Sequence, residues 1–140
     1  MRKRVLISAI SFILICALFI SFAFAATLRA SKYISSYNAV ISPAGDGNIT
    51  VECSVVGTGQ MKTLGIQSIK IYSGNGVKLT TYSYTTPGYE YLMGSDTGFK
   101  AASITYSGVS GRSYYAIITF YASDGSGSDS KSYSTITITA

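Results

Sequence analysis

Histidine and tryptophan are absent from this 140-residue chain, which has only two cysteines and two prolines. Without histidine, Ser-His-Asp and Cys-His catalysis are excluded, together with the commonest zinc and copper sites. The side chain best suited to acid–base chemistry near neutral pH is also missing. We therefore expect a protein that is not an enzyme and that holds no metal and no cofactor.

Carboxylates are scarce as well, since the chain has six acidic residues. A glycosidase needs two that converge on one bond, and the best-placed pair is Glu90 and Asp96, which flank a predicted turn. Acidic residues in turns usually form local hydrogen bonds, so a small glycan hydrolase is the least favoured function. The segment Asp124–Asp129 lacks the late glutamate of a calcium loop, which favours a flexible hairpin loop there.

The longest hydrophobic run lies at the N-terminus. Three basic residues, Arg2–Arg4, precede an apolar stretch that ends in Ala23-Phe24-Ala25, a triplet with small residues at its first and third positions. This order is typical of a secretory signal peptide. We expect a helical leader over residues 1–25 that is cleaved after Ala25, and an exported domain over residues 26–140.

Two alternatives to a cleaved leader concern the same segment. The apolar run is about 20 residues long, enough to cross a bilayer, so a retained leader would anchor the domain. This is the only membrane contact that we expect. Acylation of Cys16 would require a small residue before it, but Ile15 precedes it and apolar residues follow. A lipoprotein is therefore excluded.

Loss of the leader would change the charge and the thiol content. Without Arg2–Arg4, eight Lys and Arg residues face six acids, so the net charge falls from +5 to +2. No Lys/Arg cluster survives, and we expect no nucleic-acid partner. Cys53 would remain as a single free thiol. Its apolar neighbours favour a buried strand residue over a reactive or intermolecularly paired thiol.

The rest of the sequence is rich in Tyr, Ser, Thr, Gly and β-branched residues, which favour strands. Apolar and polar residues alternate in short segments separated by Gly, Asn, Asp and Ser, a pattern typical of an antiparallel sandwich or barrel. The clearest alternation places Ile49, Val51, Cys53 and Val55 on one face. We predict about seven strands, drawn from residues 32–41, 48–56 (ended by Gly57–Gly59), 65–73, 77–84, 89–93 (a short edge strand), 99–106, 114–122 and 132–139.

Tyr114 opens the predicted strand 114–122, in phase with Ala116, Ile118 and Phe120. This arrangement resembles the tyrosine corner of immunoglobulin-like sandwiches, in which the phenol hydroxyl bonds to the backbone of the preceding loop. The core tryptophan and cysteine pair of antibody domains are absent. The expected fold is an all-β, immunoglobulin-like or fibronectin-like antiparallel β-sandwich of about seven strands.

All 12 tyrosines lie beyond the leader. Four of them, Tyr82, Tyr84, Tyr89 and Tyr91, lie on either side of Pro87-Gly88 in two adjacent predicted strands. Exposed tyrosines suit binding to sugars or protein surfaces, so these four are the candidate ligand-binding residues. Aromatic pairing that only stabilises the sheet is the alternative.

Three segments, Ala30–Tyr37, Gly47–Val51 and Thr58–Gly65, together with the leader, resemble short secreted Gram-positive bacterial proteins of unknown function with an immunoglobulin-like β-sandwich. The resemblance spans nearly the whole chain and implies no site residues. We expect a secreted or envelope-associated, non-catalytic binding or structural module whose partner is a protein or glycan at the cell surface. The first alternative is a carbohydrate-binding module that uses the four tyrosines. The sequence predicts no oligomeric state.

Overall fold

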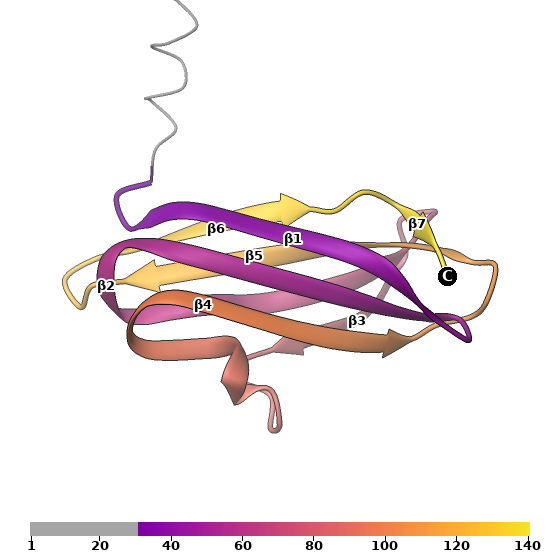
Figure 1. Cartoon of the computed structure of the whole chain (residues 1–140), viewed down its shortest axis with the longest axis horizontal. Coiled ribbons are helices and arrows are strands. Elements are labelled where there is room, and N and C mark those ends of the chain that lie inside the picture. The colour runs from indigo at the N-terminus through magenta and orange to yellow at the C-terminus, as the bar shows by residue number, and fades with distance from the viewer. Residues whose placement is uncertain (1–30) are drawn as a thin grey trace, which may run out of the picture. The chain divides into compact units, whose positions relative to one another are not determined.

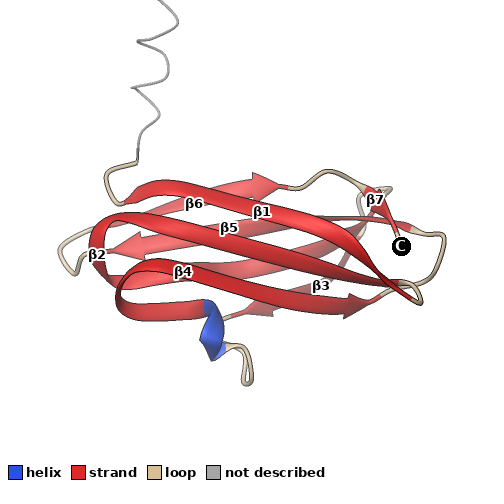
Figure 2. Cartoon of the chain, viewed as in Figure 1, coloured by secondary structure: helices blue, strands red, loops and turns tan. Residues whose placement is uncertain are grey.

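The computed structural model describes residues 31–140. The predicted leader and its cleavage site lie outside these residues. The described part is an all-β fold of seven antiparallel strands and one 3-10 turn (Figures 1 and 2). These elements are β1 (Ile34–Gly45), β2 (Asn48–Ser73), β3 (Lys78–Ser83), η1 (Glu90–Leu92), β4 (Met93–Ser107), β5 (Ser113–Ser123), β6 (Ser128–Ser134) and β7 (Ile138–Thr139).

The long strand β2 belongs to both layers of the sandwich. Its residues 48–57 pair with β1, whereas residues 63–73 pair with β5. On its other side, β4 pairs with both parts of β2, and β3 pairs with residues 68–72. One layer therefore contains β1, β2 and β4, which lie in front in Figure 1, and the other contains β3, β2, β5 and β6. This layer composition is that of the predicted fibronectin-like sandwich.

Side chains that alternate along the strands fill the space between the layers. Ala116, Ile118, Phe120 and Ala122 of β5 are fully buried, which confirms the inward face predicted for this strand. The largest fully buried side chains on β2 are Ile49, Leu64, Ile66, Ile69 and Ile71. Because a strand has a side-chain period of two, the residues between the buried ones on β5 face outward and remain partly exposed.

The predicted end of a strand at Gly57–Gly59 is wrong, because β2 continues through these residues. The pairing register between β2 and β4 shifts between Val56 and Met61. Gly57 is buried there, and a Cβ atom on it would lie 2.8 Å from the carbonyl oxygen of Gly59. Glycine in a strand often marks a bulge rather than an end, and this irregularity lies where β2 passes from one layer to the other.

Further boundaries differ from the prediction: β1 ends at Gly45 rather than at residue 41, and β6 begins at Ser128 rather than at residue 132. Residues 89–93 do not form an edge strand, since η1 occupies residues 90–92, and β4 begins at Met93 rather than at residue 99. The predicted strand 132–139 is divided into β6 and β7. The division follows from Thr135, which is buried and whose Oγ1 accepts a 2.9 Å hydrogen bond from the Ala116 backbone N–H. A side chain thereby interrupts the regular strand ladder.

Candidate functional site

The connection between β3 and β4 carries most of the predicted tyrosine site. Its backbone is held by hydrogen bonds from Tyr89 N to Thr86 O (3.0 Å) and from Leu92 N to Tyr89 O (3.1 Å). The Leu92 side chain is fully buried and fixes the turn to the core. Figure 2 shows this single helical turn at the margin of the sandwich. The tyrosines on it are therefore positioned by a fixed segment of backbone.

Three of the four predicted tyrosines come together. The ring of Tyr89 lies 5.0 Å from that of Tyr82 and 6.2 Å from that of Tyr91, measured between centroids. The interplanar angles are 54° and 36°, and tilted or offset pairs of this kind are the favoured aromatic geometry. We call Tyr82, Tyr89 and Tyr91 the tyrosine cluster. Tyr84 is partly buried against the core and makes no aromatic pair with these rings.

Exposure differs between the members of the tyrosine cluster. Tyr91 is 47% exposed, whereas Tyr82 and Tyr89 are half-buried against the core. Burial raises the pKa of Tyr82, and the neighbouring phenols, Tyr89 first among them, raise it further. Partial burial and the nearby Tyr89 raise the pKa of Tyr91 as well. At neutral pH these two hydroxyl groups are protonated and can donate hydrogen bonds.

The tyrosine cluster adjoins a hollow on the outer face of β1, β2 and β4. Tyr91 Oη donates a 3.2 Å hydrogen bond to the backbone oxygen of Ser103 on β4. Ser103 also lines the hollow, which has a volume of about 490 Å³. The other residues around the hollow are Asn38, Val40, Glu52, Cys53, Ser54, Ala101 and Ala102. Glu52 is the only charged residue among them, so the hollow offers serine hydroxyls, an amide and one carboxylate beside an aromatic surface.

Tyr114 performs a structural role at the other predicted tyrosine position. Its side chain is 3% exposed, and its hydroxyl oxygen accepts a 2.8 Å hydrogen bond from the backbone N–H of Val109 in the β4–β5 loop. This contact defines a tyrosine corner. Gly108 permits it, because a Cβ atom at that position would lie 2.9 Å from the Tyr114 hydroxyl oxygen.

Cys53 lies on β2 with a side chain that is 4% exposed. Burial raises the pKa of its thiol to about 12, and the adjacent Glu52 carboxylate contributes to the rise. Because the thiolate is the nucleophilic form, a thiol with this pKa is unreactive at neutral pH. The position and the pKa both fit a structural residue of the strand.

The two carboxylates of the predicted pair, Glu90 and Asp96, contact different partners. Glu90 Oε2 accepts a 2.9 Å hydrogen bond from Gly88 N, whereas Asp96 Oδ1 lies 3.2 Å from Lys62 Nζ in an exposed ion pair. Each carboxylate thus has its own local partner, and residues 31–140 show no hydrogen bond between them. No three His, Cys, Asp or Glu side chains in this part of the chain lie close enough to hold a metal ion.

The loop between β5 and β6 is organised by Asp124. Its Oδ1 accepts hydrogen bonds of 2.9 Å from Ser126 N, Ser126 Oγ and Gly127 N. The hydrogen bonds from Ser126 and Gly127 lower the pKa of this carboxyl. Asp124 Oδ1 therefore holds the hairpin loop together through bonds within the loop itself.

Several aromatic pairs were not predicted from the sequence, and one of them joins β2 and β5. The rings of Tyr72 on β2 and Tyr115 on β5 are stacked, with centroids 5.1 Å apart and planes inclined by 9°. The two residues are directly opposite each other in the antiparallel register. Both alternate with buried residues on their strands, so a correct alignment of β2 with β5 would have identified them.

The fold and these surfaces define the chain as an immunoglobulin-like β-sandwich with an aromatic surface beside a polar hollow. No family model matches the sequence, and no curated protein matches it significantly. No helix within residues 31–140 is long and apolar enough to cross a membrane.

Proposed function

We propose that this chain is an exported, non-catalytic binding domain of the kind found among short secreted Gram-positive proteins, acting at or near the cell envelope. The observation that carries the proposal is the contact between Tyr91 and Ser103, which joins the tyrosine cluster to the hollow. A ligand could thereby contact aromatic rings and hydrogen-bonding groups at once, which is the usual composition of a binding site.

The aromatic and the polar residues around this surface make different contributions to binding. Tyrosine rings supply a large contact area at a low cost in conformational entropy, because only two torsion angles must be fixed. Glu52, Ser54 and Ser103 supply acceptors and donors that select the orientation of the ligand. The partner on this proposal is a protein or a glycan of the cell surface.

A carbohydrate is the second, narrower candidate, and the hollow favours it. Sugars present both an apolar ring face and several hydroxyl groups, so they complement an exposed aromatic ring beside serine hydroxyls and a carboxylate. Tyr91 and the hollow of about 490 Å³ provide these groups side by side, and this volume lies within the range of small-molecule sites, roughly 300–1,000 Å³.

Co-sedimentation with Gram-positive cell envelopes tests both candidates. The matched pair of variants is Tyr91→Ala and Tyr133→Ala; Tyr133 is a comparably exposed tyrosine on β6, at 37%. We expect Tyr91→Ala to weaken binding about tenfold or more, as for an aromatic hot spot, and Tyr133→Ala to leave it within about twofold of the unmodified protein.

Protease treatment of the envelopes separates the two kinds of partner. Binding that survives the treatment identifies a glycan, and binding that disappears identifies a protein. The proposal is contradicted if the protein does not sediment with either preparation, or if Tyr91→Ala binds as well as the unmodified protein.

A further inference from the structure

The strand β4 lies at the margin of one layer of the sandwich, and we call its residues 101–107 the β4 edge. These residues pair with β2 on one side, and within residues 31–140 no strand pairs with their other side. Figure 1 shows β4 along the lower margin of the front layer. The edge of a sheet exposes unpaired N–H and C=O groups, to which another strand can add. The β4 edge therefore offers backbone groups for contact with another chain.

The strand register identifies the free backbone groups of the β4 edge. The two-residue turn between β1 and β2 closes on Asn48, so Asn48 and every second residue after it direct their N–H and C=O groups toward β1. Glu52 is one of these residues, and it lies opposite Ser103. The backbone groups of Ser103 therefore point away from β2. Those of Ala101 and Thr105 do the same, because the direction alternates along an antiparallel strand.

The side chain of Tyr91 covers the middle of the β4 edge. Its hydroxyl donates the 3.2 Å hydrogen bond to Ser103 O, which is one of the carbonyl oxygens directed away from β2. The Tyr89 ring packs against the Tyr91 ring, with centroids 6.2 Å apart, and the buried Leu92 fixes the adjacent backbone. A strand that paired with Ser103 would have to displace this hydroxyl.

The β4 edge has no other feature of sequence that opposes pairing. Residues 101–107 contain neither a charged residue nor a proline. Both are common on edge strands, because they hinder the addition of another chain. The contact with Tyr91 is therefore what closes this edge.

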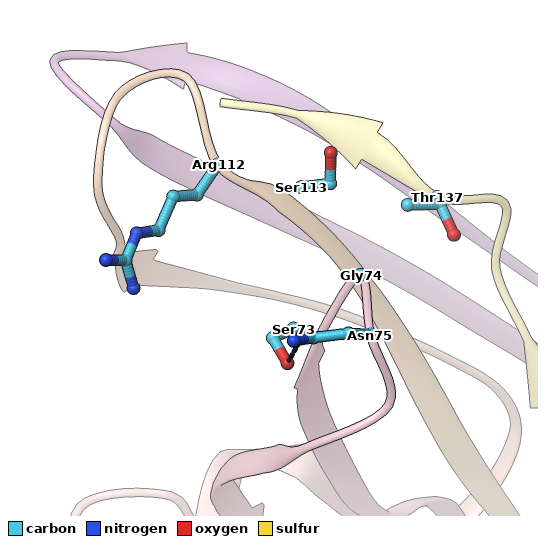
Figure 3. Close-up of a pocket in the computed structure, with 6 residues that line it drawn as sticks. All are labelled: Ser73, Gly74, Asn75, Arg112, Ser113 and Thr137. Carbon is cyan, nitrogen blue, oxygen red and sulfur yellow. Dashed lines mark hydrogen bonds between the residues drawn. The ribbon is translucent and has the colours of Figure 1, made fainter.

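Strands β1, β3 and β6 also have a free edge, and they carry residues of the kinds that hinder pairing. β1 contains Pro43, and β6 contains Asp129 and Lys131, whose charged groups lie 3.8 Å apart. β3 has six residues and begins with Lys78, soon after the turn of residues 73–75 that is drawn in Figure 3. The β4 edge thus differs from these three edges in the way that it is protected.

The β4 edge is complementary to the same edge of a second copy. If two copies pair antiparallel about Ser103, Ala101 of each copy lies opposite Thr105 of the other. Small and β-branched side chains of this kind suit cross-strand contact. The nearest cation, Lys100, would lie opposite Tyr106, so the lysines of the two copies would not face each other.

We propose that the β4 edge is a pairing surface for a second copy of this chain and that Tyr91 controls access to it. While Tyr91 is bonded to Ser103, the edge is closed and the protein is a monomer. When the Tyr91 side chain is absent or turned away, two copies pair through residues 101–105. The pairing is twofold symmetric and uses the same edge of both copies, so it closes at a dimer.

Analytical ultracentrifugation of the unmodified protein, Tyr91→Ala and Tyr133→Ala tests this proposal. Tyr133 is the matched control, because it is an exposed tyrosine on β6. At concentrations up to about 1 mM, the unmodified protein and Tyr133→Ala should remain monomeric, whereas Tyr91→Ala should dimerise with a Kd of about 1 mM or tighter. A monomeric Tyr91→Ala, equal association of the three proteins, or growth to larger assemblies would overturn the proposal.

Hydrogen exchange measured by NMR locates the contact. The backbone N–H groups of Ala101, Ser103 and Thr105 should exchange rapidly in the unmodified protein, because no strand accepts their hydrogen bonds. In the Tyr91→Ala dimer their exchange should be slower by about tenfold or more. New protection confined to another strand would contradict pairing through the β4 edge.

A second substitution in the Tyr91→Ala protein tests the symmetry of the pairing. Ser103→Lys places two like charges directly opposite each other and should weaken the dimer about fivefold or more. Ser54→Lys adds the same charge on β2, which is paired on both sides, and should leave the dimer within about twofold. Equal effects of the two substitutions would refute the proposed register. The oligomeric state is measured without envelopes, so this proposal and the envelope-binding proposal can fail independently.

Discussion

Replacement of Tyr114 by phenylalanine isolates the contribution of one hydrogen bond to the stability of the sandwich. The ring of Tyr114 is 3% exposed and packs against Tyr106 at a centroid distance of 5.8 Å. Phenylalanine keeps this packing and removes only the oxygen that accepts the 2.8 Å hydrogen bond from Val109 N. The variant therefore changes the anchoring of the β4–β5 loop while leaving the core intact.

The expected loss in free energy of unfolding is about 1–3 kcal/mol. The lower value is the net contribution of a typical hydrogen bond, and the upper value applies if the Val109 N–H is left without a partner. For a domain of about 110 residues, 1 kcal/mol corresponds to roughly 4 °C in Tm, so Tm should fall by about 4–12 °C.

Guanidinium denaturation measured by circular dichroism is the assay, and the midpoint should decrease while the m-value stays constant. Tyr133→Phe is the matched control, because Tyr133 is 37% exposed and its hydroxyl makes no hydrogen bond within residues 31–140. That variant should change the free energy by less than about 0.5 kcal/mol. If Tyr114→Phe were as stable as this control, the tyrosine corner would make no measurable contribution to the free energy of unfolding.

Two further predictions concern titrating groups. Because the pKa of Cys53 is about 12 in the fold against 9.0 for a free thiol, its thiolate fraction at pH 8 should be about a thousandfold smaller than in the unfolded chain. Alkylation by iodoacetamide, mapped to Cys53 by mass spectrometry, should be rapid in denaturant and negligible without it; equal rates would contradict the buried position. Measured by NMR, the pKa of the Asp124 carboxyl should lie below its ordinary value of 3.8. Ser126→Ala should raise this pKa part of the way back to 3.8, because it removes the hydrogen bond from Ser126 Oγ. Because the pKa is lower in the folded state, the ionised carboxyl stabilises the fold at pH values above the pKa of the unfolded chain. This contribution should disappear as the pH falls through the pKa of the folded state; a pKa at or above 3.8 would refute the loop geometry.

The sequence predicted correctly those parts of the fold in which the alternation of apolar and polar residues alone determines the structure. On β5, apolar residues occupy every second position from Tyr114 to Ala122, and all of them are buried. On the first part of β2, the same alternation buries Ile49, Val51 and Val55. A strand with one buried face requires this period of two, so the pattern identified both the strands and their inward faces.

The incorrect predictions concern residues at which local propensity and tertiary contacts favour different structures. Gly57 and Gly59 are turn residues by composition, but Gly57 pairs with Ile34 of β1 and pairing with β4 resumes at Met61, so β2 continues through them. Thr135 favours a strand by propensity, but its hydroxyl replaces a regular ladder contact of Ala116 and divides the last strand. Local propensity cannot decide such positions, because the deciding partner is distant in sequence.

The candidate surfaces were predictable to different degrees. Tyr82, Tyr89 and Tyr91 were identified because aromatic residues around a Pro-Gly turn are conspicuous, although residues 90–92 form a 3-10 turn rather than the predicted edge strand. The hollow beside them combines residues 38, 40, 52–54 and 101–103. These positions approach one another only through the pairing of β2 with β1 and with β4. A sequence pattern along one segment does not contain that information.

Stability and binding should be separable in this domain, because different residues carry them. Tyr114 is buried and bonded within the fold, whereas Tyr91 is exposed and projects from backbone that other contacts hold in place. Tyr114→Phe should therefore lower Tm without altering envelope binding, and Tyr91→Ala should weaken envelope binding with little change in Tm. Binding that depends on such an exposed side chain can change without a change of core, which is how one sandwich fold supports many ligands. A binding loss that always accompanied a fall in Tm would show instead that the binding surface depends on the stability of the whole sandwich.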